Sequence, residues 1–175
     1  MKEMKKQNRR FLGFLCFLCV LLAAAFYLKP ERLDEPAVGS VDYVSGVEGV
    51  YQYPVQPGTQ AWVDLGGTEA CLAACRVPRE TLDAMTTEAL VETAAAHPFN
   101  VDMYAFSTME DGFRSVLGKN DALAALQERP DRHEALQARL VAMAEWEQAL
   151  PAGQAASAHA RFQMSYLAFF DEYLE

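Results

Sequence analysis

The residues best suited to acid–base chemistry lie in one short stretch, 97–104, which reads HPFNVDMY. His97 is followed by Asp102 and Tyr104, and a histidine or tyrosine beside a carboxylate in one cleft can transfer a proton. A cell-envelope enzyme that uses Asp102 with His97 or Tyr104 is therefore one hypothesis. Pro98 cannot continue a helix, however, so His97 reads equally well as the end of an alanine-rich helix.

An architectural role for Asp102 is the alternative, and the surrounding pattern favours it. On a helical wheel Phe99 and Met103 share one face, while Val101 and Tyr104 lie on the other. A short helix that is apolar on both sides is typical of a buried layer. A carboxylate there needs donors, most simply the free N–H groups at the start of a neighbouring helix. We expect Asp102 to cap such a helix.

The remaining histidines and cysteines predict no metal site. His133-Glu134 begins H-E-x-x-Q, so Gln137 stands where a zinc-protease motif needs its second histidine. Cys71 and Cys75 are one helical turn apart, with Cα atoms about 6 Å apart, near the upper limit for a disulfide. Two buried free thiols are the first interpretation, a disulfide in a distorted last turn the second, and metal or redox chemistry the third.

Common catalytic and cofactor motifs are absent from the sequence. It contains no G-x-S-x-G, P-loop, glycine-rich dinucleotide turn or EF-hand loop, so we predict no cofactor. Glu88 and Glu92 are a carboxylate pair one helical turn apart, and a solvated helix face is their simplest interpretation. A site assembled in space leaves no local trace, so the enzyme hypothesis stays open.

The first 28 residues predict export. Five of the first ten residues are Lys or Arg, and 18 uncharged residues follow from Phe11 to Leu28. This pattern is typical of a signal peptide or of an uncleaved membrane anchor. Ala23-Ala24-Ala25 offers a cleavage site, while the length of the run and Tyr27 at its end suit a membrane span. Either way, the residues from Lys29 onward are expected outside the cytoplasm, secreted or held at the cell membrane.

The exported part is strongly acidic. Residues 30–175 carry 9 basic and 23 acidic groups, a net charge of −14. Such a surface repels phosphate backbones and anionic lipid, which excludes nucleic acid as a partner, and its simplest role is to keep the exterior soluble.

Residues 29–58 predict an extended tether. They are rich in Pro, Gly, Val and acids and show no helical period, with only a faint alternation of period two near its end. Their last part carries Tyr51 and Tyr53. These rings either pack on the helical body as an aromatic arm or grip a ligand near Trp62.

Residues 59–175 predict an all-α fold, a single compact domain of about six helices with short connections. Helix starts are expected at Thr59, Pro78, Thr86, a Ser107–Glu110 capping box, Asn120 and Asp131 with Glu134. The last helix carries an aromatic stripe that is either core or a partner-binding surface. The stripe consists of Phe162, Tyr166, Phe169, Phe170 and Tyr173.

Three segments carry a resemblance: YPVQPGTQAW (53–62), ACRVPRETLDAMTTEALVETAAAHPFNVDMYAF (74–106) and DGFRSVL (111–117). With them the chain resembles a family of uncharacterised exported bacterial proteins that have a Tyr-Pro-x-x-Pro-Gly-Thr arm, a following Trp and an MTTEALVET-like helix. The resemblance implies a helical exported domain and implies no mechanism. The chain departs from the pattern at Gly66-Gly67 and at Ala94-Ala95-Ala96, and Cys71 is not part of it.

The sequence thus favours a non-catalytic interaction or binding module whose partner is an unknown protein or envelope component. The cell-envelope enzyme is one alternative, and a small inhibitor or immunity-type protein with an acidic, partner-blocking surface is another. The candidate binding residues are Tyr51, Tyr53, Trp62, Asp102 and Tyr104.

Overall fold

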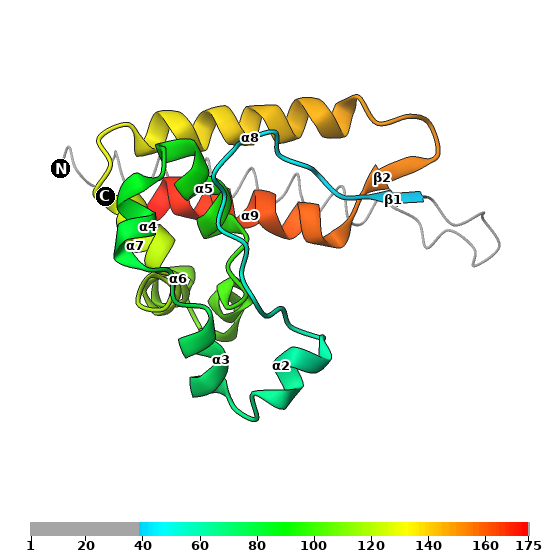
Figure 1. Ribbon diagram of the computed structural model, residues 1–175. Coiled ribbons are helices and arrows are strands. Elements are labelled where there is room, and N and C mark those ends of the chain that lie inside the picture. Colours follow the sequence, from blue (N-terminus) through cyan, green and yellow to red (C-terminus); the bar gives the residue numbers. More distant parts are fainter. Residues whose placement is uncertain (1–38, 175) are drawn as a thin grey trace. The chain divides into compact units, whose positions relative to one another are not determined.

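The structure, a computed structural model, describes residues 39–174 (Figure 1). The predicted signal or anchor segment, residues 1–28, and the first ten residues of the predicted tether lie outside this range. No helix within the described range has the length and hydrophobicity needed to cross a bilayer. Residues 39–174 are mostly helical, as predicted. They form nine helices where about six were expected, because several of the helices are only one or two turns long. The elements are β1 (Gly39–Val41), α2 (Gln60–Asp64), α3 (Thr68–Ala74), α4 (Arg79–Ala84), α5 (Thr87–Ala95), the 3₁₀ helix η1 (Asn100–Ala105), α6 (Met109–Leu117), α7 (Asp121–Gln127), α8 (Arg132–Gln148), β2 (Gln154–Ala156) and α9 (Ala158–Tyr173).

Helix α5 lies at the centre of this unit. It packs against α7, α8 and α9, while α8 and α9 run antiparallel beside one another (Figure 1). Every residue of α5 except Glu88 is buried. A short helix buried on all sides needs apolar partners around its whole circumference. The completely buried side chains of the core include Leu90, Leu123, Leu136, Met143, Leu167 and Phe170.

Local capping chemistry begins most of the helices. The side chains of Thr59, Thr86 and Asn120 accept N–H groups of the first turns of α2, α5 and α7, as the sequence predicted. The predicted Ser107–Glu110 box is wrong by one residue. Thr108 is the N-cap of α6, and its hydroxyl accepts the N–H of Asp111 at 3.1 Å. Two overlapping cap signals occur here, and the later one is used.

Two further predicted starts differ in detail. Pro78 occupies the N-cap position, with α4 beginning at Arg79. Asp131 precedes α8, but its side chain accepts the hydroxyl of Thr87 at 2.8 Å and makes no cap hydrogen bond. Asp131 therefore ties α8 to α5, which are far apart in sequence.

Residues 39–58, which we call the strap, lie on the helical body. Strand β1 pairs in parallel with β2, from Gly39 opposite Gln154 to Val41 opposite Ala156. Along residues 41–48 half-buried and exposed side chains alternate, which explains the faint period of two in the sequence. The compact unit begins at Gly39, so the strap belongs to it.

Helices η1 and α6 touch backbone to backbone at Gly112. A Cβ atom added there would lie 2.1 Å from the carbonyl oxygen of Met103. Gly112→Ala must therefore push η1 away, and we expect it to lower the free energy of unfolding by roughly 1–3 kcal/mol or more, measured by urea denaturation. Gly118→Ala is the matched control, because its nearest atoms lie at 3.7 Å and should leave stability unchanged or slightly raised. Equal effects of the two substitutions would contradict the close contact.

Candidate functional site

The aromatic arm, for which packing and ligand binding were both open, packs on the helical body. Tyr53 is only 7% exposed, its hydroxyl donates to the carbonyl of Thr93 at 3.2 Å, and its ring stands edge-on against His97. The N–H of Tyr51 donates to the hydroxyl of Thr93 at 3.1 Å. These contacts fasten the strap to α5, which matches the packing interpretation and leaves Tyr53 closed to a ligand.

Trp62 joins the same buried cluster from α2. Its ring lies 5.3 Å from that of Phe99, centre to centre, at an angle of 43°. Its backbone oxygen lies 3.6 Å from the sulfur of Cys71. Cys71 and Cys75 are both buried and free, the arrangement that the sequence put first. Trp62 therefore helps to seal α2 and α3 onto the body.

His97 is buried at the end of α5. Its Nδ1 accepts the N–H of Phe99 at 3.2 Å, and its Nε2 has no hydrogen-bond partner within residues 39–174. Burial lowers the pKa of His97 to about 4, against a smaller opposing effect of Asp121. The imidazole ring of His97 is therefore neutral at pH 7 and shielded from solvent. It is poorly placed to exchange a proton with a substrate at the surface.

Asp102 has a different partner from the one that the sequence predicted. Its Oδ2 lies 2.5 Å from the Nζ of Lys119, and both side chains are about one-third exposed. The predicted capping of a neighbouring helix by Asp102 is thus wrong. For the alternative enzyme hypothesis, His97 packs against Tyr53 while Asp102 pairs with Lys119, so these two residues are engaged with other partners.

The 3₁₀ geometry of η1 explains which of its side chains are buried and which are exposed. With three residues per turn, side chains at i and i+3 line up. Asn100 and Met103 consequently point into the core and are almost completely buried, whereas Val101 and Tyr104 are 55% and 42% exposed. A helical wheel with 3.6 residues per turn predicted that both faces of this segment would be buried. That prediction is wrong for the face that carries Val101 and Tyr104.

A pair of asparagines completes the buried end of α5. The amide of Asn100 donates to the carbonyls of Ala94 and Ala95, at 2.8 and 3.1 Å. The amide of Asn120 donates to Ala94 and to Asn100. These bonds satisfy carbonyls that a helix end leaves free. The sequence suggested the cap at Asn120 but nothing about Asn100.

A buried ion pair joins α5 to α8. Arg139 Nε lies 2.5 Å from Glu92 Oε1, Nη2 donates to Oε2 at 2.9 Å, and the two side chains are 7% and 6% exposed. The ring of Tyr43, from the strap, covers the guanidinium at 3.9 Å. The expected solvated face at Glu88 and Glu92 is therefore wrong for Glu92, because α5 is surrounded by other elements.

A cavity of about 290 Å³ lies beside this pair, under the strap. Val91 and three alanines of α8 line it, together with Ser45, whose small side chain leaves the space open. The Nη1 of Arg139 has no partner among the described residues, but it is covered from solvent. The cavity thus offers a ligand mainly apolar walls.

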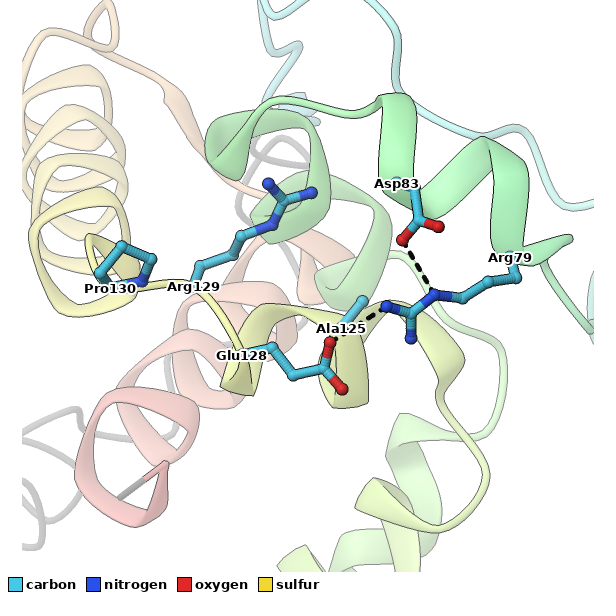
Figure 2. A pocket seen from close by; sticks show the side chains of 6 residues that line it. All are labelled: Arg79, Asp83, Ala125, Glu128, Arg129 and Pro130. Atoms are coloured by element: carbon cyan, nitrogen blue, oxygen red, sulfur yellow. Dashed lines mark hydrogen bonds and ion pairs between the residues drawn. The ribbon is translucent and has the colours of Figure 1, made fainter.

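A second cavity of about 280 Å³ lies between α4 and the end of α7 (Figure 2). Its charged groups already bind one another. Arg79 lies 2.8 Å from Asp83 and 3.1 Å from Glu128, and Arg129 donates to two backbone carbonyls. This arrangement ties α4 to α7 and reads as a surface ion-pair network. Residues 39–174 also contain no group of three His, Cys, Asp or Glu side chains placed to hold a metal.

Aromatic rings gather on one exposed surface formed by η1 and α9. The Tyr104 ring lies 6.0 Å from the rings of Phe162 and Tyr166 and 6.4 Å from that of Phe169, centre to centre. Phe162 is 47% exposed and stacks on Tyr166. We call the exposed rings of Tyr104 and Phe162, together with Tyr166 and Phe169 that pack against them, the aromatic face.

The predicted C-terminal stripe therefore divides along its length. Phe170 is completely buried and Tyr166 is 8% exposed, so these residues belong to the core. Phe162 remains open to solvent at the other end of α9. Tyr104, one of the sequence's candidate binding residues, is the ring that links η1 to this open end.

Comparison of the chain with protein-family models, with curated proteins and with solved structures finds no match.

Proposed function

We propose that this protein is an exported, non-catalytic binding module that holds a component of the cell envelope through its aromatic face. The observation that carries the proposal is the exposure of Tyr104 and Phe162, at 42% and 47%, whose rings lie 6.0 Å apart. Large apolar side chains grouped on a surface mark interaction sites, and aromatic rings supply much contact area for little lost conformational freedom.

The support of this surface is rigid. Tyr104 and Phe162 pack against Tyr166 and Phe169, which are anchored by α9 in the core. A face that is preorganised in this way loses little entropy when a partner covers it. Export of the module, and its attachment through residues 1–28, rest on the basic and apolar pattern of the N-terminus.

The two alternative functions have less support from geometry. The enzyme hypothesis needs Asp102 beside His97 or Tyr104, but Asp102 pairs with Lys119 and His97 is sealed beneath Tyr53. The inhibitor hypothesis rests on the acidic charge alone. The Tyr53 and Trp62 surface first considered for binding is occupied by the protein's own strap and helices.

Site-specific photocrosslinking in intact cells tests the proposal. A benzophenone amino acid at position 162 should form an adduct of higher mass, whereas the same group at Val141 should form none. Val141 is the matched control because it is similarly exposed, at 53%, but lies on α8. Equal labelling from both positions, or none from position 162, would remove the aromatic face as the binding surface.

A further inference from the structure

We infer that the component held by the aromatic face is the lipid–water interface of the membrane that carries the N-terminal segment. This inference rests on the proposed function and names the partner of the same surface. Three independent features of the chain lead to it: where the described unit begins, how many residues precede it, and how charge is distributed around the face.

The described unit begins next to the aromatic face. Gly39 pairs with Gln154, and the N–H of Ser157 donates to the carbonyl of Val41 at 2.8 Å. Ser157 is also the N-cap of α9, and Phe162 is the fifth residue of that helix. With a rise of 1.5 Å per residue, Phe162 lies only about 7 Å along the axis from this cap. Figure 1 shows β1, β2 and the start of α9 together at one end.

Few residues separate this point from the apolar segment. Residues 29–38 are the ten residues between Leu28, the end of the uncharged run, and Gly39. Ten residues span at most about 36 Å when fully extended, which is about the width of a small domain. A membrane-inserted segment would hold the aromatic face at high local concentration beside the bilayer surface.

The charge pattern selects the same side of the molecule. Residues 148–170 contain no Asp or Glu, one Arg and one His, although residues 30–175 carry 23 acidic groups. β2 and most of α9 therefore contribute no acids of their own to a strongly acidic module, and the carboxylates that reach them come from neighbouring elements: Asp42 accepts the hydroxyl of Ser157, and Glu147 lies 4.0 Å from Arg161. An anionic bilayer repels the acidic surfaces within about a Debye length, which turns the acid-free stretch towards the membrane.

The side chains suit an interface between water and lipid. Tyr and Phe rings are favoured at this depth, and Tyr104 keeps a polar hydroxyl on an apolar ring. Arg161 is 62% exposed beside Phe162, and its ion pair with Glu147, at 4.0 Å, is a loose one, so its guanidinium can also reach lipid phosphates.

Quenching by brominated lipids tests the inference on the full chain. The protein is reconstituted into vesicles of phosphatidylethanolamine and phosphatidylglycerol, with or without brominated acyl chains. Phe162→Trp is compared with Val141→Trp, and the signal of the parent chain, which contains Trp62 and Trp146, is subtracted. We expect bromine to reduce the added fluorescence of Phe162→Trp by roughly half or more, as for a ring 5–10 Å into the interface, and to leave Val141→Trp unchanged.

The two other outcomes overturn the inference in different ways. If the tryptophan at the face is not quenched and emits at long wavelength, the face stays in water beside the bilayer. The crosslinking experiment in cells would then decide separately whether the aromatic face binds another envelope component. If the tryptophan is not quenched but its emission is blue-shifted, a second copy of the chain covers the face, which rejects lipid as its partner. Unchanged unfolding of Phe162→Trp shows that the fold is intact.

Discussion

Replacing Arg139 by Met should lower the free energy of unfolding by about 3–5 kcal/mol, as expected for breaking a buried ion pair. Glu92, which is 6% exposed, would lose its arginine partner, and a buried carboxylate without a partner is costly. The ring of Tyr43 would also lose the cation that it covers. Urea denaturation followed by circular dichroism measures the change.

Two further variants separate the cost of breaking the pair from the value of the pair itself. Arg161→Met removes an exposed arginine, 62% exposed and 4.0 Å from Glu147, and should cost at most about 1 kcal/mol. Arg139→Met combined with Glu92→Leu removes both buried charges and should recover most of the lost stability. A double variant as unstable as Arg139→Met alone would show that packing, and not the stranded charge, sets the loss.

Acid should destabilise the domain through His97. Unfolding exposes the imidazole and returns its pKa to about 6.5, whereas burial holds the pKa at about 4 in the folded state. Between these values the unfolded chain binds more protons, so the free energy of unfolding falls as the pH is lowered. The contribution is complete above pH 6.5 and declines by roughly 1.4 kcal/mol per pH unit, about 3 kcal/mol by pH 4.

His97→Asn isolates this effect from the carboxylates and from the two other histidines. The Oδ1 of asparagine can accept the N–H of Phe99, as Nδ1 of His97 does, but it does not titrate. The stability of the parent chain, measured by urea denaturation from pH 7 to pH 4.5, should therefore fall more steeply than that of the variant. Parallel curves for the two proteins would mean that His97 is not the group responsible.

The candidate site was only partly accessible from the sequence. Tyr104 and Phe162 could be recognised as members of apolar stripes, because helical periodicity depends only on spacing. Their exposure depends on how far the neighbouring helices extend and on η1 being a 3₁₀ helix, which tertiary packing decides. The acid-free stretch 148–170 is visible in the sequence, but its position beside the strap at Gly39 appears only when β1 pairs with β2.

The sequence by itself determined the helical class of residues 39–174 and several helix starts. Thr59, Thr86 and Asn120 cap helices because a side-chain oxygen needs to reach only two or three residues ahead. These interactions are local, so they can be predicted from neighbouring letters.

Tertiary structure decided which polar groups are buried and what they meet. Glu92 binds Arg139, which is 47 residues away, and Asp102 binds Lys119, while His97 is sealed beneath a strap that looked like a free tether. The free energy of these groups depends on desolvation and on partners brought close by the fold. Neither is a property of the adjacent sequence, which is why the predicted roles of Glu92 and Asp102 changed.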